Sequence, residues 1–127
     1  MAESRIALAP GYTISRVLKG GWQLAGGHGE VDVDRSIADM EAFVEAGITT
    51  FDCADIYTGV ESLIGEYLRR RRHHLGPAAA AGVQVHTKCV PDLDRLASLT
   101  KEDIARTIDR SLDRLNAKHL DLMQLHW

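Results

Sequence analysis

Three titratable residues, Asp52, Lys88 and His126, each stand at or near the end of a run of apolar and β-branched residues. Such runs are typical of strands, and a strand of a parallel sheet is normally apolar along its length. A fourth residue, Tyr57, follows Asp52 by five positions, where the chain would leave its strand. A salt bridge or a cap explains any one of these residues. Three of them at strand ends favour one functional site, because ligands bind at the carboxyl edge of parallel sheets.

These side chains predict general acid–base chemistry. A phenol has a pKa of about 10, and a neighbouring ammonium favours its ionised form. A carboxylate would hold that ammonium in place, so Asp52, Lys88 and Tyr57 together supply a proton relay. A neutral imidazole at His126 would hydrogen-bond a substrate oxygen. The set suits proton transfer at a carbonyl or an alcohol.

The elements that position these residues alternate between strand and helix. Strands are predicted at residues 17–22, 48–52, 83–88 and 121–127, and helices at residues 33–46, from about 59 onward, and 101–116. The helices are recognised by apolar residues at spacings of three and four. Pro10-Gly11 between residues 6–8 and 13–15 predicts a preceding hairpin. Residues 76–82 and 89–99 are predicted to be loops, because they contain glycine or proline.

Each predicted helix is preceded by a side chain that can accept a hydrogen bond from its first turn. The candidates are Asp32 or Asp34 for the first helix, Thr58 with Glu61 for the second, and Thr100 with Asp103 for the third. The order of elements predicts an α/β fold with four parallel strands, three helices and right-handed crossovers, after a small β-hairpin. No change in composition marks a second domain, so residues 1–127 are interpreted as one domain.

Composition excludes several functions. Of the 127 residues, 45% are hydrophobic and 26% are charged, which is typical of a globular chain. The formal net charge of −3 gives no bulk attraction to nucleic acid or to an acidic membrane. Two cysteines, the absence of a signal-like apolar stretch near residue 1, and the absence of a membrane-spanning run favour a cytoplasmic protein.

Four segments together resemble the aldo-keto reductase family. Residues 47–57, Gly-Ile-Thr-Thr-Phe-Asp-Cys-Ala-Asp-Ile-Tyr, are similar to the family signature in which Asp-x-Ala-x-x-Tyr follows a strand. Residues 61–66 continue it. Thr87-Lys88 resembles the lysine at the end of the family's third strand, and residues 121–127 resemble its fourth strand with the active-site histidine. Residues 21–24 resemble its first-strand loop.

The resemblance implies an NADP(H)-linked enzyme that reduces an aldehyde or a ketone on a TIM (β/α)8 barrel. It implies that Tyr57 is the general acid, that Lys88 lowers the pKa of Tyr57, and that Asp52 pairs with Lys88. His126 would orient the substrate carbonyl. Gly21 and Trp22 would lie against the nicotinamide and the substrate, and Asp52 would also reach the nicotinamide ribose.

The length of 127 residues is about half of what a complete barrel requires. We therefore expect the N-terminal half of such a barrel, a partial domain that ends after its fourth strand. In the family, most cofactor contacts come from the other half, and this sequence contains no G-x-G-x-x-G fingerprint. The first and fourth strands would be open edges, so self-association through these edges is expected.

Other features have simpler interpretations. The basic run at residues 69–74 is interpreted as a solvated helix end rather than a nucleic-acid site. The glycines of residues 26–29 are interpreted as a loop. His28, His86 and His119 lack partners at metal-binding spacing, so no metal site is predicted. Cys89 adjoins Lys88 and is interpreted as a buried thiol.

Two other functions compete with the reductase. One is a non-catalytic interaction module, or a homodimer that completes a pseudo-barrel, in which the four site residues are relics. The other is a lyase or isomerase of the TIM-barrel type that forms a Schiff base at Lys88.

Overall fold

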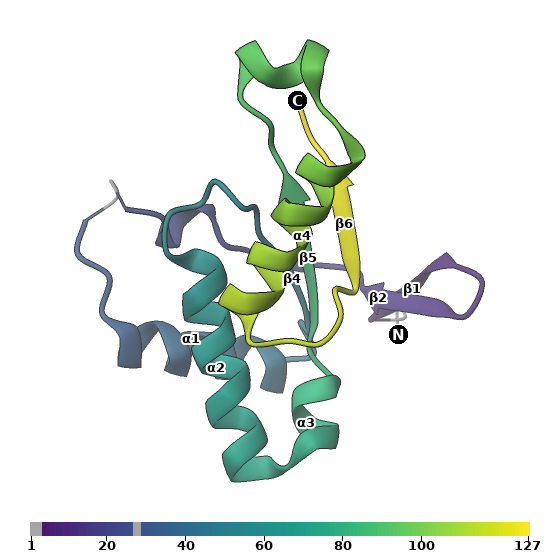
Figure 1. Ribbon diagram of the computed structural model, residues 1–127. Helices are drawn as coiled ribbons and strands as arrows, with labels where there is room; N and C mark the ends of the chain where they lie inside the picture. The colour runs from purple at the N-terminus through teal and green to yellow at the C-terminus, as the bar shows by residue number, and fades with distance from the viewer. Residues whose placement is uncertain (1–3, 27–28) are drawn as a thin grey trace.

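A four-stranded parallel sheet organises the chain (Figure 1). The computed structural model describes residues 4–26 and 29–127. The sheet has the order β3-β4-β5-β6, formed by Leu18–Gly20, Thr50–Asp52, Gln84–Cys89 and Leu122–Leu125. An antiparallel hairpin, β1 (Arg5–Ala9) and β2 (Tyr12–Ser15), precedes it. The predicted hairpin and the predicted four parallel strands are confirmed.

In the described part of the chain, three long helices and one short helix connect the strands. They are α1 (Val33–Glu45), α2 (Val60–Leu75), α3 (Pro77–Ala81) and α4 (Lys101–Leu115). Two 3₁₀ turns, η1 (Trp22–Leu24) and η2 (Leu93–Ser98), follow β3 and β5. The loop predicted at residues 76–82 is wrong in part, because α3 occupies most of it. Pro77 begins that helix, where its missing N–H and fixed φ are compatible with helical geometry.

Helix caps agree with the sequence at two of the three helices. Asp32 accepts a hydrogen bond from Arg35 at the start of α1, and Thr100 and Asp103 form a reciprocal capping box at α4. The box predicted for Thr58 and Glu61 is wrong. The residue before α2 is Gly59 in a left-handed conformation (φ 79°), and no side chain caps the helix. Glu61 is buried and accepts hydrogen bonds from Thr87 and Arg114 instead of capping the helix.

The sheet separates an outer face from an inner face. Because side chains alternate along a strand, Phe51, Val85 and Thr87 point to one face, and Asp52, His86 and Lys88 to the other. The outer face packs against the helices, as seen where Phe51 stacks on Tyr67 of α2 with ring centroids 5.9 Å apart. Figure 1 shows α1, α2 and α4 gathered beside the sheet and the hairpin near its lower end.

Close helix packing on the outer face depends on one glycine. Gly65 lies in α2 where that helix crosses α4, and a Cβ there would lie 2.9 Å from backbone atoms of Leu115. A side chain would push the two helices apart. The core around this contact contains Met40, Phe51 and Ile64, each almost fully buried.

The hairpin docks on the inner face at the amino ends of the strands. Ser15 and Thr50 exchange hydrogen bonds of 3.0 and 3.1 Å between backbone and hydroxyl groups. Arg5 donates to Gln84 of β5 at 3.2 Å, and the hydroxyl of Tyr12 lies 2.8 Å from Nε2 of His86. The lower part of the inner face is therefore covered by polar contacts, and Lys88 and Asp52 lie towards the opposite, carboxyl end.

No helix within residues 4–26 and 29–127 has the length and apolar character to cross a membrane.

Candidate active site

The carboxyl ends of the four strands bring the predicted site residues to one edge. Asp52 is the last residue of β4, and Lys88 lies one residue before the end of β5. Gly21 directly follows β3, and His126 directly follows β6. Parallel pairing in the order β3-β4-β5-β6 makes these four positions neighbours along the edge.

Lys88 and Asp52 form a tightly held ion pair. Nζ of Lys88 lies 2.8 and 2.9 Å from the two carboxylate oxygens of Asp52. The third donor position of the ammonium is used by the carbonyl oxygen of Cys53, at 2.8 Å. The Lys88 side chain is 14% exposed and that of Asp52 is 34% exposed. The charge is thus fixed in position while one side of the pair stays open to a ligand.

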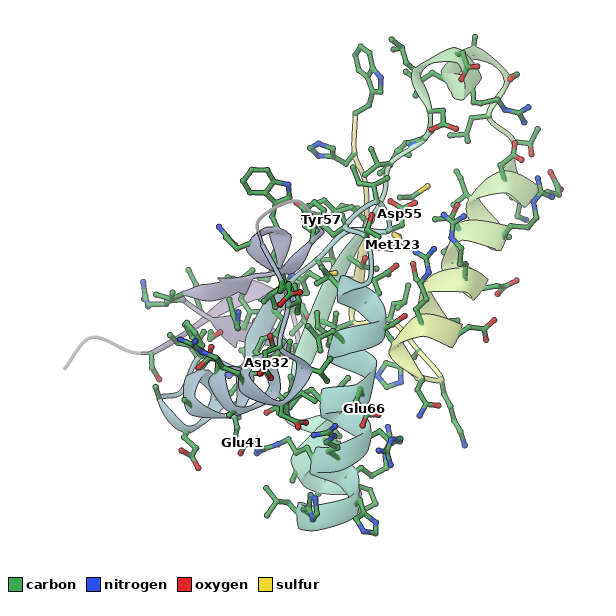
Figure 2. All side chains as sticks on the ribbon, turned by 90° about the vertical axis from the view of Figure 1, so that its left-hand side faces the viewer. Asp32, Glu41, Asp55, Tyr57, Glu66 and Met123 are labelled. Carbon is green, nitrogen blue, oxygen red and sulfur yellow. The ribbon has the colours of Figure 1, made fainter. Side chains whose placement is uncertain are left out.

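Tyr57 lies on the loop between β4 and α2, beside this ion pair. Its backbone N–H donates to Ala54 at 3.1 Å and its carbonyl accepts from Val60 at 3.0 Å, so both sides of the residue are anchored. Nζ of Lys88 is 5.5 Å from the centroid of the Tyr57 ring, within the range of a cation–π contact. Figure 2 shows Tyr57 at this end of the sheet, away from Glu41 and Glu66 on the helices.

His126 occupies the next position along the edge. Its backbone N–H donates to the carbonyl of Cys89 at 3.0 Å, which continues the ladder between β5 and β6 past the end of the strand. Lys88 pairs in register with Gln124, so alternation places His126 on the same inner face as Lys88. The residue is exposed. The structure therefore joins Lys88 to both Asp52 and Tyr57, and places the exposed His126 at the next position along the same edge.

Gly21 and Trp22 border the site on its other side. The N–H of Gly21 donates to the carbonyl of Asp52 at 2.8 Å, and a Cβ on Gly21 would lie 2.9 Å from Cγ1 of Val60 and 3.0 Å from that carbonyl. Only glycine fits this contact without displacing its neighbours. Trp22, which begins η1, is 54% exposed and offers an aromatic surface at the edge.

Two buried acids behind the site were not assigned to it from the sequence. The carboxylate of Asp55 accepts from Val90 N–H at 3.1 Å and from Arg110 at 3.2 Å, and burial raises its pKa despite these partners. Glu61 accepts from the hydroxyl of Thr87 at 3.0 Å and from Arg114 at 3.1 Å. In the sequence, Asp55 stands within the signature-like segment two residues before Tyr57, and Glu61 was predicted to be a helix cap.

His86 lies two residues before Lys88 on the same inner face. Burial lowers its pKa below the ordinary value, an effect that Lys88 reinforces and that the carboxylates of Asp121 and Asp52 oppose. This shift favours the neutral imidazole, whose hydrogen-bond partner is Tyr12. It separates the ion pair from the hairpin.

Other features singled out from the sequence are accounted for structurally. Arg69 and Arg70 of the basic run pair with Glu66, and Arg70 also pairs with Asp34 at 2.7 Å, as expected of a solvated helix face. Cys89 is buried as predicted, with 3% exposure. Part of the glycine-rich segment 26–29, with His28, lies outside the described residues. In the described part of the chain, no three His, Cys, Asp or Glu side chains gather in a way that could hold a metal ion.

Among the described residues, two of the grooves lie beside the sheet. One, of about 380 Å³, lies outside the site between Ile56, Pro91 and the amino-terminal half of α4. The other, of about 560 Å³, lies at the opposite end of β5, between α3 and the turn that follows α4. Neither is lined by Asp52, Tyr57, Lys88 or His126.

The fold and the edge geometry define a class: a partial parallel β/α barrel with a Lys–Asp–Tyr cluster at the carboxyl ends of its strands. The model of the aldo/keto reductase family matches residues 16–127. The chain belongs to this family, as its motifs predicted.

Several known proteins are similar along nearly the whole chain. A 6-dehydroglucose reductase of Agrobacterium fabrum is 31% identical over 96% of this chain and 43% of the relative. The uncharacterized oxidoreductase YcsN of Bacillus subtilis and the oxidoreductase YdhF of Escherichia coli are each 30% identical, over 96% of this chain and 42% of each relative. The chain thus spans less than half the length of these relatives.

A solved structure agrees with the fold. A thermostable aldo-keto reductase, Tm1743, crystallised with the inhibitor epalrestat, superposes with a TM-score of 0.76 at 23% identity. The match covers 97% of this chain and 42% of that protein. The predicted partial barrel is therefore confirmed.

Proposed function

We propose that the chain provides the proton-transfer site of an NADP(H)-dependent oxidoreductase that reduces an aldehyde or a ketone to an alcohol. The observation that carries the proposal is the joining of Asp52, Lys88 and Tyr57 at one sheet edge, with Nζ of Lys88 both ion-paired and 5.5 Å from the Tyr57 ring. Membership of the aldo/keto reductase family and relatives named as oxidoreductases support it.

In this proposal Tyr57 donates its phenolic proton to the carbonyl oxygen of the substrate. The Lys88 ammonium stabilises the negative charge that develops on the phenol as the proton leaves. Asp52 and the Cys53 carbonyl hold the ammonium in that position, so it needs no rearrangement during the reaction. His126, exposed on the same face, orients the substrate oxygen as a hydrogen-bond donor.

The residues present fit the nicotinamide end of NADP(H). Trp22 offers an exposed indole surface for stacking, and Asp52 keeps a one-third exposed carboxylate that can accept from ribose hydroxyls. Gly21 lets the backbone pass close to Asp52 without a side chain. When bound, the dinucleotide supplies the hydride.

The test is a Tyr57→Phe variant of the full gene product, assayed by loss of NADPH absorbance with a panel of aldehydes and ketones. We expect kcat to fall by about 10²–10⁴, the usual contribution of a positioned acid. Affinity for NADPH, measured by fluorescence titration, should change little. Tyr67→Phe, which removes a hydroxyl that bonds Glu41 on the helix side of the sheet, serves as the matched control. Equal activity of Tyr57→Phe and wild type would overturn the general-acid role.

A non-catalytic role remains the second candidate, and the sheet edges favour it. Within the described residues β3 and β6 each pair on one side only, and Leu125 and Trp127 are 64% and 75% exposed. Such edges can pair with a second copy or another chain. Light scattering after size exclusion tests this: a stable dimer that binds no NADPH would support an interaction module, and a monomer that binds NADPH would exclude it. A cytoplasmic location is proposed in addition, supported by the unpaired buried thiols Cys53 and Cys89.

A further inference from the structure

Asp55 fastens the Tyr57 loop to the strand end that carries Lys88. Its backbone N–H donates to the carbonyl of Lys88 at 3.0 Å, and its Oδ1 accepts from the N–H of Val90 at 3.1 Å. Asp55 therefore bonds both to Lys88 within β5 and to Val90, the residue that directly follows β5. Figure 2 shows Asp55 and Tyr57 at the same end of the sheet. Asp55 lies only two positions before Tyr57, so its place fixes where the Tyr57 backbone begins.

Arg114 of α4 holds both ends of the same loop. Its Nη1 donates to the backbone carbonyl of Asp55 at 2.9 Å and to Oε1 of Glu61 at 3.1 Å. Tyr57 lies between these two anchors. A second arginine of α4, Arg110, contributes a bond of 3.2 Å to the Asp55 carboxylate. The guanidinium of Arg114 thus connects the two ends of the loop, and that of Arg110 holds the Asp55 side chain at the first end.

We call Arg110 and Arg114, together with the carboxylates of Asp55 and Glu61, the arginine clamp. This clamp also reaches the β5 backbone beside Lys88. The other oxygen of Glu61 accepts from the hydroxyl of Thr87 at 3.0 Å. Thr87 directly precedes Lys88, and its side chain points to the helices while that of Lys88 points to the inner face. Glu61 is 1% exposed and Thr87 is fully buried. Arg114 itself is 37% exposed, so the network is buried on its acceptor side. Breaking one of its bonds would leave a buried oxygen of Glu61 or Asp55 unpaired, which resists movement of the loop.

None of the clamp side chains enters the inner face, so their effect on the site passes through the backbone. We propose that Arg114 is a positioning residue: through Asp55 and Glu61 it sets the separation between the Tyr57 phenol and the Lys88 ammonium. This inference rests on the proposed function for its catalytic meaning. A displacement of about 1 Å in a reacting group can lower a rate about 10²-fold.

The first experiment compares Arg114→Met with Arg106→Met in the full gene product. Arg106 lies on the same helix, is 70% exposed, and pairs with Asp103 of the same helix. We expect Arg114→Met to lower kcat at least tenfold, to move the pH profile of kcat, and to leave the Kd for NADPH within about twofold. Arg114→Lys, which keeps the charge, should recover part of the loss. Arg106→Met should match wild type in all three measurements.

The second experiment observes Tyr57 without any substrate. The protein is labelled with 3-fluorotyrosine, and the ¹⁹F NMR signal of Tyr57 is identified by its loss in Tyr57→Phe. We expect this signal to shift or broaden in Arg114→Met and to stay in place in Arg106→Met. An unmoved signal together with a merely lower Tm would overturn the positioning role.

The two readouts separate the two proposals. A moved Tyr57 signal in a protein that reduces no carbonyl would uphold the clamp and refute the reductase. If the protein is an active reductase and neither its Tyr57 signal nor its pH profile changes in Arg114→Met, the reductase is upheld and the positioning role of Arg114 is refuted. Should Arg114→Met fail to fold, Arg114→Lys and Arg110→Met carry the same measurements, since Arg110 is 52% exposed and removal of its bond frees only one oxygen of Asp55.

Discussion

Lys88 bonds to Asp52 diagonally across two strands rather than straight across. The register of β4 and β5 places Asp52 opposite His86, and Lys88 lies two residues further along. The ammonium nevertheless reaches both carboxylate oxygens, at 2.8 and 2.9 Å. Because Asp52 ends its strand, the carboxylate leans toward the edge where Tyr57 lies. The ion pair is therefore directed at the open end of the sheet.

This geometry predicts strong coupling between Lys88 and Asp52. Lys88→Met should lower kcat/KM by about 10²–10⁴, and Asp52→Asn should lower it by less. The double variant should be little worse than Lys88→Met, because both changes disable one unit and such effects are not additive. Steady-state kinetics on all three variants, with exposed Lys101→Met as the control, measures this. Fully additive losses would mean that the two residues act separately.

Gly21 should tolerate no side chain. In Gly21→Ala the new Cβ would meet Val60 at 2.9 Å and the Asp52 carbonyl at 3.0 Å, so the loop must move. We expect a loss of about 1–3 kcal/mol in unfolding free energy, as for other overpacked sites. Chemical denaturation measures it. Gly26→Ala, at a position with open space around it, should stay within about 0.5 kcal/mol of wild type. Equal stability of the two variants would contradict the contact.

His86 should make the fold sensitive to mild acid. Its pKa is lowered from 6.5 in the folded state, so the unfolded chain takes up a proton first as the pH falls. The stability that depends on neutral His86 is complete above about pH 6.5 and is lost progressively as the pH falls towards the folded pKa. The groups that face the His86 ring are the hydroxyl of Tyr12 and the charged side chains of Asp121, Asp52 and Lys88. A comparison of His86 variants leaves all four of these residues unchanged.

Urea unfolding at pH 7 and pH 5 checks this. His86→Gln should lose less unfolding free energy than wild type over this interval, because an amide cannot be protonated there. His73→Gln, at an exposed position near the end of α2, should lose as much as wild type. An identical pH dependence in all three proteins would show that His86 does not control it.

The sequence was sufficient where a local pattern and a tertiary constraint agree. The strand ends at Asp52, Lys88 and His126 were predicted to within two residues, because an apolar run interrupted by a charged group marks the sheet edge. The capping box of Thr100 and Asp103 formed as predicted, since its partners are three residues apart. The placement of Tyr57 followed from its distance to Asp52 along the chain.

The sequence was insufficient where distant residues decide. Thr58 and Glu61 have the spacing of a capping box. Glu61 nevertheless points into the core between the sheet and the helices, because Arg114 and Thr87 donate hydrogen bonds to its carboxylate there. Those partners are separated from it by 53 and 26 residues. The arginine clamp has the same origin. In the sequence, Arg110 and Arg114 have the pattern of ordinary charged residues of an amphipathic helix. The neighbouring residues do not distinguish them from Arg106.

The alternation along β5 also bears on how the gene tolerates change. Val85 and Thr87 pack against helices, whereas His86 and Lys88 face the inner side. In a saturation library scored separately for abundance and for turnover, substitutions at the buried Val85, His86 and Thr87 should lower abundance, and substitutions at Lys88 should lower turnover. An in-frame deletion of one codon before Lys88 would exchange the two sets at once. Such a deletion would lower abundance and turnover together, and a second mutation that restored only one of them would not restore function. Insertions and deletions in this segment should therefore be rarer among functional alleles than substitutions.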